Sequence, residues 1–262
     1  MAKNHSIGTG IPATDTFSAH EITTILFDLD GTLRHTVPNG QDVLVEYAVT
    51  LGAPANPDLR RLAMKWSHQY WAVSECLLND LKIYGRENQE FWQNYARRQL
   101  EAIRVPPQQA EEWAPLIHSH MLDNYQPEDV ILEDVLPALQ SLRQAGYTLG
   151  LVTNRHSPVD EYLEHLGLDS YLDFWVVAGE IGAWKPQPEI FQYALGQANA
   201  SPDQVVYVGD NYYSDVLGAQ KADIQPLLLD PTGIFPEADC IVIQSIAELI
   251  SILPEKADII DS

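Results

Sequence analysis

The sequence predicts an α/β fold in which a parallel β-sheet is interrupted by a module made only of helices. From residue 128 onward, strand patterns alternate with helix patterns, which is typical of a parallel sheet flanked by helices. An apolar run at residues 22–27 precedes them and is expected to form a further buried strand. The stretch 34–126 between these two parts contains helical patterns and no convincing strand. We therefore expect the helices to be inserted directly after the first strand.

The expected elements of the sheet part follow one another closely. Within residues 133–145, Val135, Leu139 and Leu142 recur at helical spacing, and Gly146 stands where such a helix would end. Further helices are expected at residues 159–166, 188–198, 214–222 and 246–253, and strands at residues 147–153, 174–178, 205–208, 227–229 and 240–243.

The inserted stretch is expected to hold helices at residues 41–51, 57–79, 87–103 and 107–124. Pro106 and Pro107 separate the last two, because proline disrupts a helix interior. Aromatic residues at helical spacing favour an apolar core of these helices over a ligand pocket. They are Trp66, Tyr70, Trp71, Phe91, Trp92 and Tyr95. The chain thus divides into a flexible extension at 1–20, a sheet core at 21–33 and 127–262, and a helical domain at 34–126.

Composition argues against several classes of protein. The 262 residues carry a formal net charge of −22, which would repel nucleic acids and anionic membrane surfaces. No apolar run reaches the roughly 18–20 residues needed to span a bilayer. Cys76 and Cys240 form no disulfide framework, so a reducing, cytoplasmic setting is expected. A phosphorylated substrate would need a local positive charge, from a divalent cation or a lysine, to overcome the field of the protein.

The most informative residues are Asp28 and Asp30, which follow the first apolar run in the segment Asp-Leu-Asp-Gly-Thr. Two carboxylates this close at a strand end are costly to bury unless a cation or a shared proton compensates them. Similar acidic turns also occur in calcium loops and on ordinary surfaces. A metal-assisted site is the explanation that the rest of the chain favours.

Residues suited to phosphate chemistry follow each of the other predicted strands. Thr153 and Asn154 offer a hydroxyl group and backbone amides, Lys185 is a cation next to a proline, and Asp210 is followed five residues later by Asp215. Each has an ordinary interpretation, as a turn, a helix cap or a solvated lysine. Because ligands gather at the carboxyl ends of parallel strands, their joint occurrence in this order predicts one site.

Taken as an ordered set, these motifs resemble those of the haloacid dehalogenase (HAD) superfamily of phosphohydrolases. The set comprises Asp28-x-Asp30-Gly31-Thr32, Thr153, Lys185-Pro186 and Gly209-Asp210 with Asp215. The resemblance covers about residues 22–253 and implies a Rossmann-like core. The inserted helices resemble the C1-type cap of that family, a mobile element that would close over the site and select the substrate.

The resemblance also implies roles for the individual residues. Asp28 would be the nucleophile that forms an aspartyl-phosphate, and Asp30 would be the general acid and then the general base. Magnesium would be held by the carboxylates of Asp28 and Asp210 and by the backbone carbonyl of Asp30.

Thr153, the amides around Asn154, and Lys185 would hold the phosphoryl oxygens, with Thr153 and Lys185 counted among the catalytic residues. Asp215 would order metal-bound water or orient Lys185. Relatives often carry an acidic residue close after the first motif, whereas this chain has Arg34 and His35, which could reach the substrate or merely cover the site.

The expected function is the magnesium-dependent hydrolysis of a small phosphorylated metabolite. Asp30 favours a phosphatase over a dehalogenase, because displacement of a halide needs no proton donor. A phosphomutase acting on a sugar phosphate and a non-catalytic binding or regulatory protein with the same fold remain alternatives. Cleavage of a phosphonate would need a lysine among the helices, and Lys65 and Lys82 are candidates. Lys65, Lys82, Arg86 and Arg97 are candidates for contacting a distal anion of the substrate.

Overall fold

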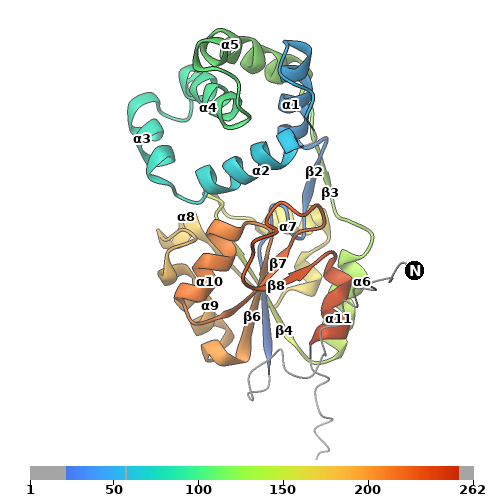
Figure 1. The fold of residues 1–262 in the computed structure, drawn as a ribbon. Coiled ribbons are helices and arrows are strands. Elements are labelled where there is room, and N and C mark those ends of the chain that lie inside the picture. Colours follow the sequence, from blue (N-terminus) through green and yellow to red (C-terminus); the bar gives the residue numbers. More distant parts are fainter. Residues whose placement is uncertain (1–21, 57, 254–262) are drawn as a thin grey trace, which may run out of the picture.

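The computed structural model describes residues 22–56 and 58–253, and the extension expected at residues 1–20 lies outside them. A six-stranded parallel sheet forms the lower half of the molecule in Figure 1, with the strand order β5-β4-β1-β6-β7-β8. The strands are β1 (Thr24–Phe27), β4 (Thr148–Thr153), β5 (Phe174–Val177), β6 (Val205–Gly209), β7 (Gln225–Leu229) and β8 (Ile241–Ile243). The predicted α/β fold with a Rossmann-like parallel sheet is confirmed.

Side chains of β1 alternate between the two faces of the sheet, as expected for a strand buried on both sides. Ile25 and Phe27 belong to a core formed with α6 (Val135–Gln144), α7 (Asp160–Leu166) and α11 (Leu249–Ile252). Leu26 belongs to the opposite core, formed with α9 (Pro188–Ala198) and α10 (Leu217–Lys221). Phe27 pairs with Leu151 of β4 and with Val208 of β6, so β1 is central and holds the residues that follow it in place.

The inserted helices are α1 (Gly40–Thr50), α2 (Asp58–Trp71), α3 (Glu75–Tyr84), α4 (Gln89–Ala102) and α5 (Pro107–Asn124). They lie beyond the carboxyl ends of the sheet strands (Figure 1). One apolar cluster contains Leu44, Ala63 and Leu100. A second contains Tyr70, Phe91 and Tyr95. The partly buried Trp66, Trp71 and Trp92 pack against it, so the predicted aromatic residues form a core as expected.

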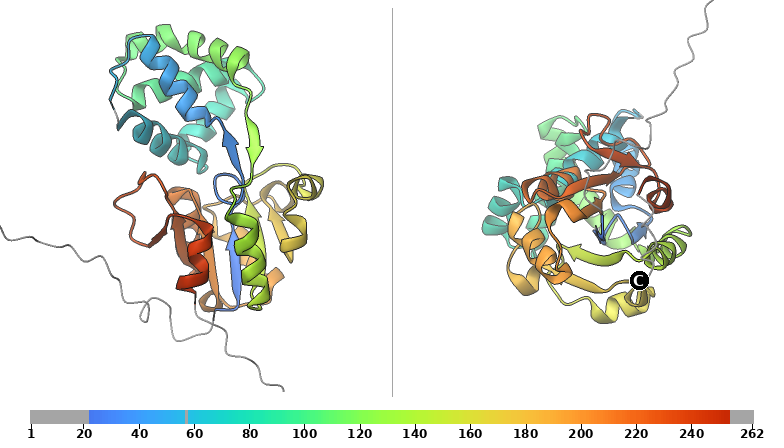
Figure 2. Two further views of the ribbon diagram at one scale, coloured as in Figure 1. Left: turned by 90° about the vertical axis from the view of Figure 1, so that its right-hand side faces the viewer. Right: turned by 90° about the horizontal axis from the view of Figure 1, so that it is seen from below.

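The prediction that the stretch 34–126 contains no strand is wrong. The segment β2 (His35–Val37) pairs in antiparallel fashion with β3 (Glu128–Val130), and the two strands connect the helices to the sheet (Figure 2). A strand of three residues is too short to show a periodic pattern, and its pairing partner lies on the far side of the insertion. Its Val37 is 54% exposed, so burial gives no signal either.

The prediction of a single helix at residues 57–79 is also wrong, because the structure has the two helices α2 and α3 in its place. Val73 adopts a positive φ of 52°, which a helix cannot continue through. Ser74 then caps α3, since its side chain accepts a hydrogen bond from the backbone N–H of Leu77 at 3.1 Å. The helix predicted at residues 214–222 begins as a π-helical turn at Tyr212–Val216 and continues as α10. None of the described helices is both long and apolar enough to cross a membrane.

Candidate active site

The carboxyl ends of the central strands bring the predicted site residues to one cavity of about 610 Å³. Asp28 follows β1, Thr153 ends β4, and Asp210 follows β6. Lys185 lies in the loop before α9, and Asp215 lies in the π-helical turn. The cavity is lined by Asp28, Asp30, Thr153, Asn154, Lys185, Asp210 and Asp215, together with residues from the helices above.

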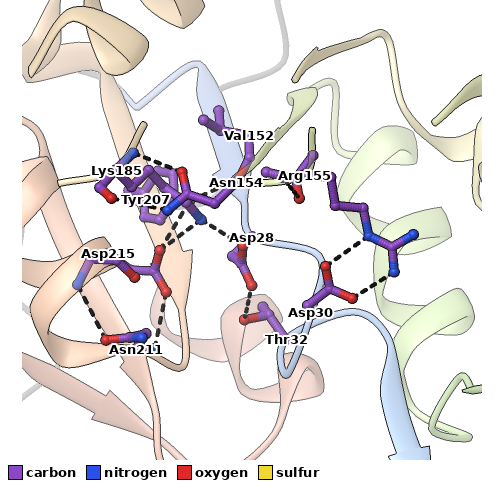
Figure 3. Close-up of polar contacts among 12 residues, drawn as sticks. Asp28, Asp30, Thr32, Val152, Asn154, Arg155, Lys185, Tyr207, Asn211 and Asp215 are labelled. Atoms are coloured by element: carbon purple, nitrogen blue, oxygen red, sulfur yellow. Dashed lines mark hydrogen bonds and ion pairs between the residues drawn. The ribbon is translucent and has the colours of Figure 1, made fainter. Parts of the chain in front are cut away.

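Lys185 stands at the centre of the charged group (Figure 3). Its Nζ lies 2.5 Å from Asp28 Oδ1, 2.8 Å from Asp215 Oδ1 and 2.8 Å from the hydroxyl oxygen of Tyr207. The side chain of Lys185 is only 2% exposed. The three acceptors thus satisfy the ammonium group, which would otherwise be very costly to bury.

Burial also changes the protonation of these groups. It raises the pKa of Asp28 to about 7, although the charge of Lys185 partly offsets the effect. The pKa of Asp210 is also raised, by burial and then by the negative charges of Asp28 and Asp215. Burial alone would lower the pKa of Lys185, but the carboxylates of Asp215 and Asp28 outweigh it and raise that pKa. Lys185 therefore stays protonated, but its single positive charge does not balance the negative charges of the carboxylates around it.

The donor set fits a divalent cation that prefers oxygen ligands. Asp28, Asp210 and Asp215 each offer a carboxylate oxygen, and these oxygens lie within 4.8 Å of one another. Asp215, expected from the sequence to order metal-bound water or to orient Lys185, thus belongs to this group as well. The carboxylate of Asp30 does not, so that only its backbone carbonyl remains a possible ligand.

Two glycines make room for these carboxylates. Gly31 has a φ of +98°, and a Cβ atom at this position would collide with the carboxylate of Asp210. A Cβ atom on Gly209 would collide with the carboxylate of Asp215. Both glycines belong to the quoted motifs, so the close approach of backbone and carboxylates explains their place in them.

Asp30 is held at the edge of the cavity by two arginines, Arg155 and Arg34, of which Figure 3 shows Arg155. Arg155 donates from Nε to Asp30 Oδ2 at 2.9 Å and from Nη2 to Asp30 Oδ1 at 2.8 Å. Arg34 donates to Asp30 Oδ1 at 3.0 Å and also pairs with Asp129 of β3. Arg34 thus covers and orients the acid. The side chain of Arg155 was not singled out from the sequence, although it follows Thr153 and Asn154 directly.

The side chain of Asn154 forms hydrogen bonds with the backbone of Lys185. Its side chain accepts a hydrogen bond from the backbone N–H of Lys185 at 2.7 Å and donates one to the backbone carbonyl of Lys185 at 2.9 Å. The Thr153 hydroxyl oxygen accepts a hydrogen bond from the N–H of Arg155 at 3.3 Å. The loop after β4 is therefore tied to the lysine loop, which fixes the position of the ammonium group.

Helix α2 contributes Ser67, His68 and Trp71 to the same cavity, and the turn between α3 and α4 contributes Arg86. The Nε2 of His68 lies 3.6 Å from Asp210 Oδ2, and burial lowers the pKa of His68 to about 4, so the imidazole is neutral at neutral pH. The guanidinium of Arg86 lies 5.1 Å from the centre of the Trp71 ring.

Of the four predicted anion-binding cations, Arg86 alone among the described residues lines the cavity. Lys65 pairs with Glu237, and Arg97 pairs with Glu101. Lys65 and Lys82, the candidates for phosphonate cleavage, are both absent from the described lining of the cavity.

A family model described as haloacid dehalogenase-like hydrolase matches residues 22–223, which include Asp28, Asp30, Lys185, Asp210 and Asp215. The chain therefore belongs to the haloacid dehalogenase-like hydrolases, and the resemblance noted in the sequence is confirmed at the level of the family.

Individual relatives carry different names. Pyrimidine 5'-nucleotidase YjjG of Escherichia coli (strain K12) is 28% identical over 192 residues, which are 68% of this chain and 83% of that protein. Pyrophosphatase PpaX of Bacillus cereus (strain ATCC 10987 / NRS 248) is 27% identical over 206 residues, 77% of this chain and 80% of that protein. The crystal structure of 2-haloacid dehalogenase from Pseudomonas syringae pv. Tomato DC3000 matches with a TM-score of 0.50 and 27% identity, covering 88% of this chain and 98% of that one.

Proposed function

We propose that this protein is a magnesium-dependent phosphatase that hydrolyses a small phosphorylated metabolite through an aspartyl-phosphate on Asp28. The observation that carries the proposal is the buried contact between Asp28 and Lys185, in a cavity that Asp30 also lines. The names of two relatives, a 5'-nucleotidase and a pyrophosphatase, support phosphate chemistry. The free thiols Cys76 and Cys240 support a cytoplasmic location.

The carboxylates of Asp28, Asp210 and Asp215 would hold the magnesium ion, with the backbone carbonyl of Asp30 as a further ligand. When bound, the ion would supply the positive charge that lets an anionic phosphate approach an anionic nucleophile. Lys185 and Thr153 face the same cavity and would share the charge of the equatorial phosphoryl oxygens.

Lys185 holds Oδ1 of Asp28, so the other oxygen, Oδ2, is the one that would attack. As its bond to phosphorus forms, the bond between phosphorus and the leaving oxygen breaks. The hydroxyl group of Thr32 donates a hydrogen bond to this Oδ2 at 3.4 Å and would keep the carboxylate in one orientation. Water then attacks phosphorus, the bond between phosphorus and Oδ2 of Asp28 breaks, and inorganic phosphate leaves while the carboxylate of Asp28 is restored.

Asp30 would donate a proton to the leaving oxygen and later accept one from the attacking water. Its contacts with Arg155 and Arg34 orient its carboxylate at the edge of the cavity. A dehalogenase is the rival function, because one similar solved structure carries that name. Displacement of halide from carbon needs no proton donor, so a dehalogenase would not use Asp30 as a general acid.

The test compares Asp30→Asn with the unchanged protein on alkyl phosphates and on p-nitrophenyl phosphate, in magnesium. We expect Asp30→Asn to lose at least about 100-fold in turnover of alkyl phosphates, whose leaving groups need a proton. Nitrophenolate leaves without one, so the variant should release one equivalent in a burst and then stall at the aspartyl-phosphate.

Asp160→Asn, at an exposed position of α7, is the matched control and should be fully active. Unchanged turnover by Asp30→Asn would contradict the assigned role. The proposal would give way to a dehalogenase if the unchanged protein consumed a 2-haloacid and hydrolysed no phosphate ester faster than Asp28→Asn does. Formation of an isomer from a sugar phosphate, instead of free phosphate, would replace it by the mutase.

A further inference from the structure

The carboxylate of Asp30 depends on two arginines for its orientation. It is 39% exposed, and among the described residues all three hydrogen bonds to it come from Arg155 and Arg34. An arginine side chain has several rotatable bonds, so it fixes a partner only where its own guanidinium group is held. The position of the proposed general acid therefore depends on what holds these two guanidinium groups.

An aspartate and a tyrosine outside the described lining of the catalytic cavity hold both groups. Asp129 of β3 accepts a hydrogen bond from Arg34 through Oδ1, and it accepts one from the hydroxyl group of Tyr162 through Oδ2 at 2.5 Å. The guanidinium group of Arg155 lies over the ring of Tyr162, 4.0 Å from its centre. Both arginines also bind Asp30, so the five side chains close a ring.

Tyr162 has a fixed place in this ring of side chains. It lies on α7 next to the completely buried Leu163, and it packs against the same apolar core. Burial raises the pKa of Tyr162, and its contact with Asp129 raises it further, so the hydroxyl group keeps its proton and acts as a donor. Burial alone would raise the pKa of Asp129, but the hydrogen bonds from Tyr162 and Arg34 outweigh it and lower that pKa. Asp129 is therefore ionised at neutral pH, which strengthens both hydrogen bonds that it accepts.

The ring joins parts of the chain that lie far apart in the sequence. Asp30 and Arg34 belong to the segment between β1 and β2, Asp129 belongs to β3, and Tyr162 belongs to α7. Ion pairs near a surface usually contribute little, but a bidentate arginine contact inside a network of charges can fix a carboxylate. The geometry of the ring therefore bears directly on the direction of the acid.

We propose that Tyr162 and Asp129 are positioning residues, which hold the two arginines so that these direct the carboxylate of Asp30 toward the leaving oxygen. The inference rests on the proposed phosphatase function, because that function gives Asp30 a proton to transfer. Neither positioning residue lines the catalytic cavity. Their loss should therefore slow the steps in which Asp30 moves a proton and spare the attack by Asp28.

The test compares Tyr162→Phe, which keeps the ring but loses the hydroxyl group, with the unchanged protein in magnesium. We expect kcat for alkyl phosphates to fall about 3- to 10-fold with KM unchanged, which is the effect of one lost hydrogen bond. The first turnover of p-nitrophenyl phosphate should keep its rate, because nitrophenolate leaves without a proton. Asp129→Asn should give the same pattern, and it serves as the test if Tyr162→Phe does not fold.

Tyr193→Phe is the matched control, because Tyr193 is exposed on α9, and it should hydrolyse both substrates as the unchanged protein does. In the background of Asp30→Asn, Tyr162→Phe should cause no further loss, since the tyrosine acts through that acid.

Three results would overturn the inference: no loss in the folded Tyr162→Phe and Asp129→Asn variants, an equal loss in the first turnover of p-nitrophenyl phosphate, or a loss that adds to that of Asp30→Asn. Unchanged hydrolysis of alkyl phosphates by Asp30→Asn alone would instead contradict the proposed role of Asp30, and the inference would fall with it.

Discussion

The Nζ of Lys185 lies 2.5 Å from Asp28 Oδ1, although 157 residues separate them in the chain. Both side chains are buried, so the pair forms only because β1 and the loop before α9 meet at the same edge of the sheet. Asn154 holds the backbone of Lys185 on one side, and Tyr207 accepts a hydrogen bond from its ammonium group on the other. The lysine is thus fixed before any substrate arrives, as electrostatic catalysis requires.

Replacement of this lysine by an apolar residue should strongly destabilise the metal-free protein. Lys185→Met leaves Asp28 and Asp215 buried without their counterion, and removal of one partner from a buried ion pair costs about 3–5 kcal/mol. Urea unfolding in the presence of a chelator measures the loss. Magnesium should recover part of it, because the ion can replace the missing charge. Lys221→Met, at an exposed position, should change stability little, and an equal loss in both variants would contradict this account.

Gly31→Ala should impair metal binding more than stability alone would explain. The alanine would be strained at a φ of +98°, at a cost of about 1–2 kcal/mol, and its Cβ atom would displace the carboxylate of Asp210. Gly167 provides the matched control, because it also has a positive φ, of +69°, but a Cβ atom there would meet nothing within 4 Å. Magnesium titration should therefore show weakened affinity for Gly31→Ala and ordinary affinity for Gly167→Ala. Equal affinities would remove Asp210 from the metal site.

Stabilisation by magnesium should increase with pH. Burial raises the pKa of Asp28 from its ordinary 3.8 to about 7, so between these values the metal-free folded protein keeps a proton that the unfolded chain has lost. This raised pKa makes the metal-free protein less stable as pH rises through that window. Magnesium must displace the same proton, so the ion stabilises less at low pH.

The measurement is the magnesium-induced shift in Tm at about pH 5.5 and about pH 8, and the shift should be larger at the higher pH. The magnesium-induced shift is compared rather than Tm itself, because the titration of His68 changes the stability of the protein with pH in the opposite direction to that of Asp28. Burial lowers its pKa from 6.5 to about 4, so its contribution to stability is lost as pH falls through this range. Asp28→Asn should flatten the pH dependence, and a shift that is independent of pH in the unchanged protein would refute the assignment.

The sheet could be predicted from the sequence because its strands are apolar runs with clear ends, most of them buried, although the edge strand β8 is only partly buried. The elements that join the two parts could not. The strand β2 has three residues, and its pairing of His35 with Val130 depends on chain segments brought together only by folding. The break between α2 and α3 rests on the positive φ of Val73, a residue type that gives no hint of that conformation.

The candidate site shows the same division. The acids and Lys185 carry recognisable chemistry at or after strand ends, so the sequence was enough to predict that they meet in one cavity. Tyr207 lies within the apolar strand β6 and reads as a core residue, yet its hydroxyl contacts Lys185 and lies 3.4 Å from Asp215. The bidentate contact of Arg155 with Asp30 could not be predicted, because side-chain direction after β4 depends on the completed fold.

The most direct test of the central claim is chemical trapping of the phosphorylated nucleophile. The protein is incubated with magnesium and its best phosphate-ester substrate, quenched with borohydride and digested, and the peptide containing residue 28 is analysed by mass spectrometry. Borohydride reduces an aspartyl-phosphate to homoserine, so we predict homoserine at position 28 in the presence of substrate and none in Asp28→Asn. Release of phosphate with an unmodified Asp28, or with homoserine at another aspartate, would contradict the account.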